Sequence, residues 1–471
     1  MQEITLSTDD LHKLRPETAW HYQVLPKEWS ANEFELYCSE SSDLEMLEEE
    51  MRVVLGANVR LYALPKPTVE RLLSKYYQRA GNEKAPETSA KSGNYLRKLI
   101  AEARTLRSSD IHIEIYESKC RVRMRIDGLL VERQLIPQED YSLLVNIIKV
   151  ESNLDIAEKR LPQDGRMSFV TAESKFDIRV SVLPTLYGEK VVLRLLNNDA
   201  ADITLERLGF SDRDLNNFLQ GVKRPNGLLL ISGPTGSGKT TTLYATLKLL
   251  NEERRNILTI EDPIEYTMNG INQTQLKESI GLTFGEALRT FLRQDPDVIM
   301  VGEIRDQDTA NMAIRAAMTG HLVLSTIHTN SAWGTVNRLI DMGIPAFMLS
   351  GTLNTTVAQR LVRLLCPDCK KKVGYDPSVF PPHFRLPEEI ETCYEPEGCG
   401  KCFFTGYKGR KAIYEVIPID LELSGEIKKN NQQVNDLLDA RGIGTLAGNA
   451  FSLFRDGATS AEEIYPLLFN F

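Results

Sequence analysis

One stretch of the sequence constrains the fold more than any other: Gly-Pro-Thr-Gly-Ser-Gly-Lys-Thr at residues 233–240. The apolar run Gly227–Ser232 comes directly before it and is typical of a buried strand, and Thr241–Leu250 follow with a helical pattern. In a strand, glycine-rich turn and helix of this kind, backbone N–H groups and the helix N-terminus surround phosphate groups. The stretch therefore predicts a phosphate-binding loop in an α/β domain.

The motif assigns roles to its own residues. Lys239 is expected to reach the β- and γ-phosphates of a nucleotide, and the Thr240 hydroxyl is expected to ligate magnesium. The expected phosphate-binding residues are Gly233, Pro234, Thr235, Gly236, Ser237, Gly238, Lys239, Thr240 and Thr241. An ordinary glycine-rich turn between a strand and a helix is the alternative interpretation.

A second apolar run, Val298–Val301, is followed by Gly302 and Glu303 and preceded by Asp297. In a parallel sheet, ligands bind at the carboxyl ends of the strands. At about 3.3 Å per residue the strand separates Asp297 from that edge. Glu303 is therefore the predicted acid of the magnesium and water site.

A third apolar run, Ile257–Ile260, leads to Glu261 and Asp262, and Glu265 follows three residues later. One of these three acids is expected to orient or deprotonate the attacking water. Charges in a solvated loop are the alternative interpretation.

Two histidines flank the apolar run Leu322–Ile327, with His321 before it and His328 after it. The geometry of a parallel strand predicts that His328 lies at the phosphate edge and senses the γ-phosphate, whereas His321 lies at the other end. A packed, hydrogen-bonded structural histidine is the alternative for each of them.

The remaining sequence divides into modules. Residues 1–77 mix strand-like and helical runs and predict a small N-terminal module, and the polar residues 78–93 predict a flexible linker. Residues 94–197 combine a helical pattern with alternating strands such as Val122–Ile126, which predicts a second, α+β domain. Residues 198–471 carry the nucleotide motifs on continuous apolar runs separated by helices, the pattern of a mostly parallel sheet.

Four of the seven cysteines, Cys366, Cys369, Cys399 and Cys402, form two C-x-x-C pairs. This spacing predicts a closed tetrahedral zinc site with a structural role, in a module over residues 366–402 of the ATPase domain. Four reduced cysteines without a metal are the alternative.

Composition limits the partners. The net charge of −9 and the pI of about 5.5 argue against broad nucleic-acid binding, which needs a basic surface. No apolar run approaches the roughly 18–20 residues of a membrane-spanning helix, and the first residues lack the pattern of a secretory signal. We expect a cytoplasmic protein that reaches the inner membrane only through partners.

The motifs together resemble the hexameric ATPases of type II secretion and type IV pilus assembly, also called secretion-traffic ATPases. The similarity extends from about residue 95 to 465. Besides the phosphate-binding loop, it is carried by Asp110–Glu114, Arg160–Arg166, Ile260–Tyr266, Leu292–Asp297, Gly302–Asp306, Thr319–His321 and Ser325–Asn330.

The resemblance implies a RecA-like ATPase domain that is preceded in the sequence by a PAS-like α+β domain. It implies an aspartate box at Glu261–Tyr266 in which Glu265 activates water, a degenerate Walker B element ending in Glu303, and a histidine box of His321 and His328. An arginine finger neutralises γ-phosphate charge in the transition state. The arginines that the resemblance places around the phosphates or at a subunit interface are Arg179, Arg194, Arg289, Arg293, Arg305 and Arg410.

The resemblance also implies a homo-hexameric, magnesium-dependent ATP hydrolase that moves an inner-membrane platform protein and so assembles a pseudopilus or a pilus. The N-terminal module lacks the Arg-Leu-Gly-led repeat with which some members bind a cyclic dinucleotide, so it is expected to dock a membrane-associated protein. One alternative is a pilus-retraction or DNA-transfer motor, which the zinc module and the acidic composition disfavour. Another is a nucleotide-gated scaffold with little hydrolysis, which Glu265, Glu303 and His328 disfavour.

Overall fold

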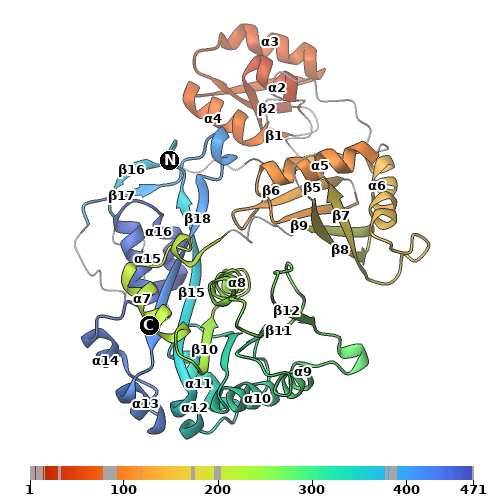
Figure 1. Cartoon of the computed structure of the whole chain (residues 1–471). Coiled ribbons are helices and arrows are strands. Elements are labelled where there is room, and N and C mark those ends of the chain that lie inside the picture. The colour runs from red at the N-terminus through yellow and green to blue at the C-terminus, as the bar shows by residue number, and fades with distance from the viewer. Residues whose placement is uncertain are drawn as a thin grey trace. The chain divides into compact units, whose positions relative to one another are not determined.

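The computed structural model describes residues 6, 14, 16–29, 33–77, 93–117, 119–170, 175–195, 203–376, 380 and 390–468. They form two compact units (Figure 1). The smaller unit comprises Met1–Tyr95 with Cys366–Lys371 and Pro396–Lys408, and the larger comprises Leu96–Leu365, Lys372–Glu395 and Gly409–Phe471. The predicted linker 78–93 lies outside the described residues except for Gly93.

The N-terminal part of the smaller unit is a three-stranded sheet with helices. β2 is central, antiparallel to β1 and parallel to β3. Leu36 of β2, Met51 and Leu73 are fully buried and join sheet and helices in one core. The elements are α2 (Pro16–Tyr22), β1 (Val24–Trp29), β2 (Glu33–Ser39), α3 (Leu44–Leu55), β3 (Asn58–Leu64) and α4 (Lys66–Tyr76).

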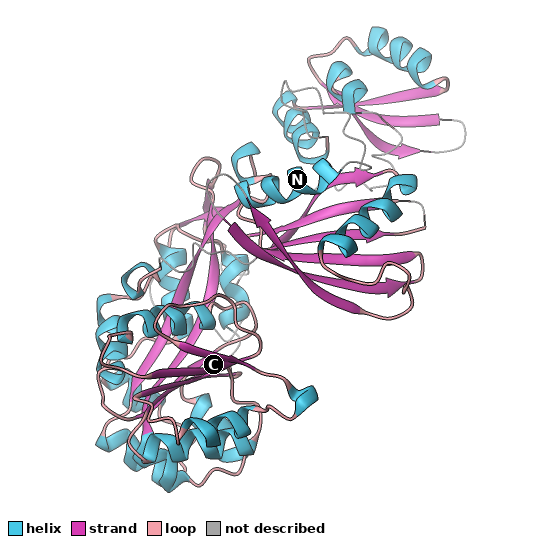
Figure 2. Cartoon of the chain, turned by 45° about the vertical axis from the view of Figure 1, so that its right-hand side comes forward, coloured by secondary structure: helices cyan, strands magenta, loops and turns pink. Residues whose placement is uncertain are grey.

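The larger unit begins with a six-stranded sheet in the order β6-β5-β4-β9-β8-β7, whose neighbouring strands all run antiparallel (magenta in Figure 2). Alternate residues such as Ile111, Val122 and Val180 are buried, which leaves the intervening polar residues on the other face. The elements are α5 (Gly93–Thr105), β4 (Asp110–Ile115), β5 (Cys120–Ile126), β6 (Leu129–Ile136), α6 (Gln138–Glu151), β7 (Gln163–Val170), β8 (Lys175–Thr185) and β9 (Gly188–Leu195).

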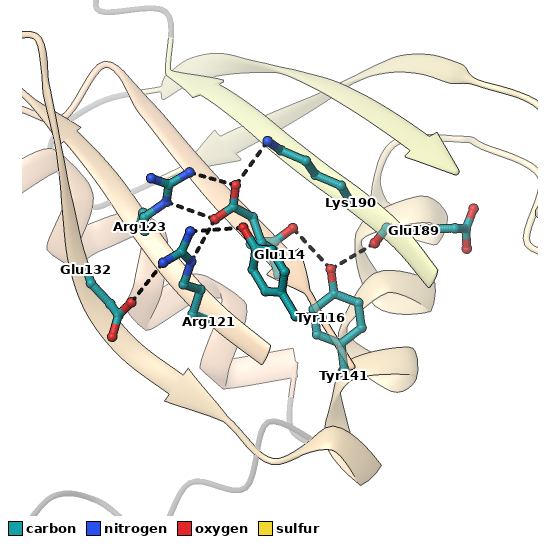
Figure 3. A network of polar contacts seen from close by, with 9 residues as sticks. Glu114, Tyr116, Arg121, Arg123, Glu132, Tyr141, Glu189 and Lys190 are labelled. Atoms are coloured by element: carbon teal, nitrogen blue, oxygen red, sulfur yellow. Dashed lines mark hydrogen bonds and ion pairs between the residues drawn. The ribbon is translucent and has the colours of Figure 1, made fainter. Parts of the chain in front are cut away.

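The polar face of this sheet carries an ion cluster around Glu114 (Figure 3). Arg121, Arg123 and Lys190 lie 3.0, 2.8 and 3.0 Å from its carboxylate oxygens, and the carboxylate is almost fully buried. Burial alone would raise the pKa of Glu114, but hydrogen bonds from Arg123 and Lys190 hold that pKa at about 2. The face is thus polar and ordered.

The second sheet of the larger unit has seven strands in the order β12-β11-β13-β14-β10-β15-β18, of which the first six run parallel. Every residue of β10, β11, β13 and β14 is buried. Its strands are β10 (Gly227–Ser232), β11 (Ile257–Glu261), β12 (Asn272–Gln275), β13 (Val298–Val301), β14 (Leu322–Ile327), β15 (Leu353–Leu365) and β18 (Tyr407–Pro418).

Two separate cores lie on the two faces of this sheet, because Leu228 and Leu230 pack in one and Leu229 and Ile231 in the other. The predicted parallel sheet with both faces covered is therefore present. The helices are α7 (Asp212–Val222), α8 (Lys239–Leu250), α9 (Phe284–Phe291), α10 (Gln307–Met318), α11 (Gly334–Asp341), α12 (Ala346–Thr352), α13 (Leu421–Lys428), α14 (Asn435–Ala440), α15 (Leu446–Arg455) and α16 (Ala461–Leu468).

A two-stranded sheet of β16 (Lys371–Gly374) and β17 (Thr392–Glu395) lies between the cysteine pairs in the sequence. Among the described helices, none combines the length and the apolar composition that crossing a bilayer requires.

Candidate active site

The phosphate loop (Gly233–Thr240) leaves the sheet at the end of β10 and enters α8, which begins at Lys239. Ser232, the last residue of β10, is paired with Ile327 of β14 on one side and Ala358 of β15 on the other. The loop therefore rises from an interior strand, and the free N–H groups at the start of α8 face the same edge of the sheet.

Close packing explains two glycines of the loop. Gly233 and Gly238 have φ angles of 152° and 88°, a region that favours glycine. A Cβ atom on Gly233 would lie 2.5 Å from the carbonyl oxygen of Gln359, and one on Gly238 would lie 2.8 Å from its Nε2. Larger residues do not fit, so β15 shapes the cradle that the sequence predicted.

Lys239 lies over the loop with little exposure. Its Nζ donates hydrogen bonds to the carbonyl oxygens of Gly233 (2.7 Å) and Pro234 (3.0 Å). Burial lowers the pKa of Lys239 to about 8, against the opposing effect of the Glu303 charge. The next residue, Thr240, is exposed. The site thus offers a desolvated cation and an accessible hydroxyl, which suit a phosphate and its magnesium ion.

The carboxyl ends of β13 and β14 bring Glu303 and His328 together. Val301 is paired with Ser325, and the hydroxyl of Thr326 donates to the carbonyl oxygen of Gly302 at 2.8 Å, which fixes the two strand ends. Nε2 of His328 lies 3.4 Å from Oε2 of Glu303. The negative charge of Glu303 opposes the lowering of the Lys239 pKa.

Arg305 and Asp262 extend this group. The Arg305 guanidinium forms an ion pair with Glu303 and lies 3.6 Å from the Asp262 carboxylate. Asp262 follows β11 and Glu303 follows β13, so one arginine spans the ends of two neighbouring strands. Asp262, Glu303 and Arg305, which were predicted separately from the sequence, are thus neighbours.

The three candidate water-binding acids have different surroundings. Glu261 is buried, and its carboxylate accepts hydrogen bonds from Tyr244, from Thr259 (2.6 Å) and from Gln273 (3.1 Å). Burial raises the pKa of Glu261. By contrast, the Glu265 side chain is 38% exposed, and its backbone N–H donates to the Tyr244 hydroxyl at 3.2 Å. Glu261 is thus part of the scaffold, and Glu265 remains accessible to water.

Arg179 of β8 lies against the aspartate box. Its Nη2 donates to the carbonyl oxygen of Ile264 at 2.6 Å and lies 3.3 Å from the Glu265 carboxylate. Burial lowers the pKa of Arg179, and the Glu265 charge opposes this. Arg179 is therefore in direct contact with the accessible acid.

Arg194 has a different partner, because its Nε lies 2.9 Å from Oδ1 of Asp110. Arg179 and Arg194 are opposite each other in the register of β8 and β9. Asp110 raises the pKa of Arg194, against the effect of burial, and the Arg194 side chain is 60% exposed. Arg194 is thus anchored in its own sheet with much of its side chain accessible.

Three other predicted residues have contact partners outside this group. Arg289 pairs with Glu286 on α9, and Arg293 donates to the carbonyl oxygen of Arg289 at 2.9 Å. Arg410 is 3.9 Å from the carboxylate of Asp127.

His321 lies at the start of β14, where its Nδ1 is 2.8 Å from the carbonyl oxygen of Ala316 and 3.2 Å from the Thr319 hydroxyl. It therefore stands at the amino end of the strand that carries His328 at its carboxyl end. Within one chain, β14 separates the two histidines.

The four cysteines of the C-x-x-C pairs converge, and their sulfur atoms all lie within 4.8 Å of one another. The Sγ distances are 3.9 Å for Cys366–Cys399, 3.7 Å for Cys369–Cys402 and 3.8 Å for Cys399–Cys402. Tetrahedral zinc with Zn–S bonds of about 2.3 Å requires sulfur atoms about 3.8 Å apart. The donor set therefore fits zinc.

Sequence reasoning missed Tyr244 and Gln359. Tyr244 is buried on α8 and connects Glu261 with Glu265, while the Gln359 side chain accepts a hydrogen bond from Thr242 at 2.9 Å. A tyrosine within a buried helix and a glutamine in a central strand both require hydrogen-bond partners. That requirement is visible in the sequence, but the identity of the partners is not.

Known proteins resemble this chain over most of its length. A model of the family described as type II/IV secretion system protein matches residues 87–466. Type II secretion system protein E of Pseudomonas aeruginosa is 46% identical over 377 residues, which cover 78% of this chain and 73% of that protein. Type IV pilus assembly ATPase PilB of Myxococcus xanthus is 46% identical over 375 residues, which cover 78% of this chain and 66% of that protein.

Solved structures share the fold. The pilus retraction motor PilT with bound ADP superposes with a TM-score of 0.55 at 27% identity, covering 79% of this chain and 96% of that chain. The Legionella pneumophila ATPase DotB gives a TM-score of 0.62 at 20% identity, covering 82% of this chain and 98% of that chain. The predicted fold class, a RecA-like ATPase domain preceded by an α+β domain, is confirmed.

Proposed function

The chain belongs to the type II/IV secretion system protein family and is an ATP hydrolase, and we propose that it is the motor that assembles a type II secretion pseudopilus or a type IV pilus. The observation that carries the proposal is the group of side chains at the ends of three parallel strands, Lys239 after β10, Glu303 after β13 and His328 after β14. In a parallel sheet, a nucleotide binds at this carboxyl-end edge.

In the proposed mechanism, the phosphate loop binds the nucleotide through its backbone N–H groups and Lys239. The hydroxyl of Thr240 would hold magnesium, and the carboxylate of Glu303 would help to keep the ion in place. When bound, magnesium neutralises charge on the β- and γ-phosphate oxygens. The desolvated Lys239 ammonium adds a second positive charge, which stabilises the transition state more strongly than a fully hydrated one would.

Glu265 is the proposed group that orients the attacking water and takes up its proton. Its carboxylate is accessible and lies 3.3 Å from Arg179, and its backbone N–H is held by Tyr244. Two contacts from different elements thus define the position of this acid, as general-base catalysis requires. The contact between His328 and Glu303 supports a role of the histidine next to the γ-phosphate.

We further propose that Arg194, whose side chain is largely accessible, acts at a subunit boundary of a homo-hexamer, together with Arg289, Arg293, Arg410 and His321. Each of them contacts partners outside the phosphate loop of its own chain, which supports such a role. The proposed domain boundaries are those of the sequence analysis, with a docking module at residues 1–77, a second domain at 94–197 and an ATPase domain from residue 198.

The proposed location is the cytoplasmic side of the inner membrane, reached through a platform protein and a membrane-associated docking protein. Assembly is favoured over retraction, because relatives named for secretion or pilus assembly are 46% identical, whereas the retraction motor is 27% identical.

The experiment that tests the proposal is ATP turnover of the purified chain with platform-protein vesicles and with empty vesicles. We expect the platform protein to raise turnover of the wild-type chain, and a Lys239→Ala chain to stay inactive in both. Equal rates in both kinds of vesicle would contradict coupling through a platform.

The four-cysteine cluster is the proposed structural zinc site, closed to water by four sulfur ligands. We predict one zinc per chain by metal analysis, and its loss, with a lower melting temperature, in Cys399→Ser, because the binding energy of a closed site contributes to folding. Cys393→Ser is the matched control, since Cys393 is a buried cysteine outside the cluster. A zinc-free wild-type protein would refute the assignment.

A further inference from the structure

β15 borders the phosphate loop on the side opposite β14, and Arg360 is the charged residue that it places there. The pairing of Ser232 with Ala358 puts the next residues of both strands side by side. A Cβ atom on Gly233 would lie 3.1 Å from Nη1 of Arg360. The guanidinium therefore lies against the first residue of the loop.

The same guanidinium reaches the segment that follows His328. Nη2 of Arg360 donates to the carbonyl oxygens of Thr329 (3.3 Å) and Asn330 (3.0 Å), while Nη1 donates to the carbonyl oxygen of Gln359 (3.0 Å). Arg360 thus ties the segment after β14 to β15, next to the start of the phosphate loop.

The partners of Arg360 are backbone carbonyls. Among the described residues, no carboxylate lies within 4 Å of its guanidinium. Burial lowers the pKa of Arg360, and the charge of Glu415 opposes this. A partly desolvated arginine without an ion pair is unfavourable for stability by itself. Its five donors in a planar fork, however, can hold several carbonyl oxygens at fixed positions, which a lysine cannot do.

A second contact fixes the same segment from the other side. The buried carboxylate of Glu415 on β18 accepts a hydrogen bond from the backbone N–H of Ala332 at 2.7 Å. Residues 329–332 are therefore held from two strands, and His328 directly precedes them with its Nε2 3.4 Å from Glu303. A shift of this segment would move His328 relative to Glu303.

We propose that Arg360 is a positioning residue for ATP hydrolysis, which holds the segment after His328 in register with the phosphate loop and so fixes His328 beside Glu303. Arg360 acts through backbone carbonyls and does not touch the nucleotide. The inference rests on the proposed role of His328. Because Lys239 and the loop N–H groups bind the nucleotide, loss of Arg360 affects the chemical step more than nucleotide binding.

The test compares Arg360→Met, which keeps most of the side chain's length, with the control Arg363→Met. Arg363 lies on the same strand but pairs with Glu463 of α16. We expect Arg360→Met to lower kcat at least about tenfold while KM for ATP and the Kd for ADP stay within about threefold. Arg363→Met should lower the melting temperature and leave kcat within about twofold. An unchanged kcat in Arg360→Met, or a loss that appears only in KM, would overturn the proposal.

Two further variants separate this inference from the assignment of His328. Arg360→Lys keeps the positive charge but loses the planar guanidinium, so its kcat should lie between those of the wild type and Arg360→Met. This variant also tests the proposal if Arg360→Met does not fold. If Arg360 acts through His328, the double variant with His328→Ala should lose no more kcat than the more impaired single variant. Additive losses would overturn the positioning role, whereas full activity of His328→Ala alone would refute the role of His328.

Discussion

The two large sheets of this chain present their polar side chains in opposite ways. In the seven-stranded sheet, β10, β13 and β14 are buried along their whole length, and neighbouring residues pack into different cores on the two faces. In the six-stranded sheet, buried and partly exposed residues alternate along β5. Polar side chains that can reach a ligand therefore lie only at the strand ends of the seven-stranded sheet. In the six-stranded sheet they are distributed over one face.

The difference determines how each group of side chains is built. His328 directly follows β14, Glu303 follows β13 after Gly302, and Lys239 begins α8 after the phosphate loop that leaves β10, so all three belong to one edge of the sheet. The arginines of the six-stranded sheet instead form a row across strands, in which Arg166 is opposite Arg179, Arg179 opposite Arg194, and Arg194 opposite Asp110. We propose that the side chains at the strand ends hydrolyse ATP and that the arginine row only orients catalytic groups. Substitutions at the strand ends should then lower ATP turnover more than substitutions in the arginine row.

The largest effect is expected for Lys239→Ala. We predict ATP turnover at least about a thousandfold below wild type, because no other described cation donates to the loop carbonyls that Lys239 occupies, and its charge acts directly on the phosphates. Steady-state phosphate release by the purified chain measures this. Near-normal turnover would show that the loop is not the hydrolytic site.

A smaller effect is expected in the six-stranded sheet. Arg179→Met removes the contact that orients Glu265 but leaves the acid in place, so we predict that kcat falls roughly ten- to a hundredfold. Arg133→Met is the control, because Arg133 belongs to the same sheet and forms a 2.7 Å ion pair with Glu102. If both variants lose the same activity, Arg179 has only a structural role.

The contrast also explains what the sequence could predict. Glu303 and His328 were predictable because a buried parallel strand has one functional end, and the phosphate loop marks which edge of the sheet that is. The residue spacing left Glu261, Asp262 and Glu265 as equal candidates for water activation, and only the family resemblance pointed to Glu265. Their burial and partners, which depend on Tyr244 and on a distant strand, distinguish them only in the fold.

The arginine row was beyond local reasoning, because its members come from separate strands and only the strand register makes them neighbours. Resemblance to a family pointed to Arg179 and Arg194, but the ion pair of Arg194 with Asp110 did not follow from it. Arg360 escaped notice because its partners are backbone carbonyls, which leave no trace in the residue pattern.

The smallest effect is expected from pH. The pKa of Lys239 is lowered to about 8, so above that pH the lysine is neutral in the nucleotide-free protein and must take up a proton to bind an anion. We predict that ADP binding weakens as pH rises from 7 to 9.5, by at most about tenfold per pH unit. The last ionisation of a phosphate group has a pKa of about 6, so the phosphate groups of ADP lose few further protons in this range. Titration calorimetry in two buffers would show the proton uptake, and a constant Kd would contradict the assigned pKa.

The most direct test of the central claim compares the two acids that flank β13. Glu303 follows the strand at the phosphate edge, whereas Asp297 precedes it and accepts a hydrogen bond from the backbone N–H of Asn256 at 2.7 Å. The measurement is ATP turnover and ADP affinity of Glu303→Gln and Asp297→Asn side by side. If chemistry lies at the carboxyl ends of the parallel strands, Glu303→Gln binds ADP but loses at least about a hundredfold in kcat, while Asp297→Asn stays within about twofold of wild type. Equal activity of the two variants, or a greater loss in Asp297→Asn, would contradict the account.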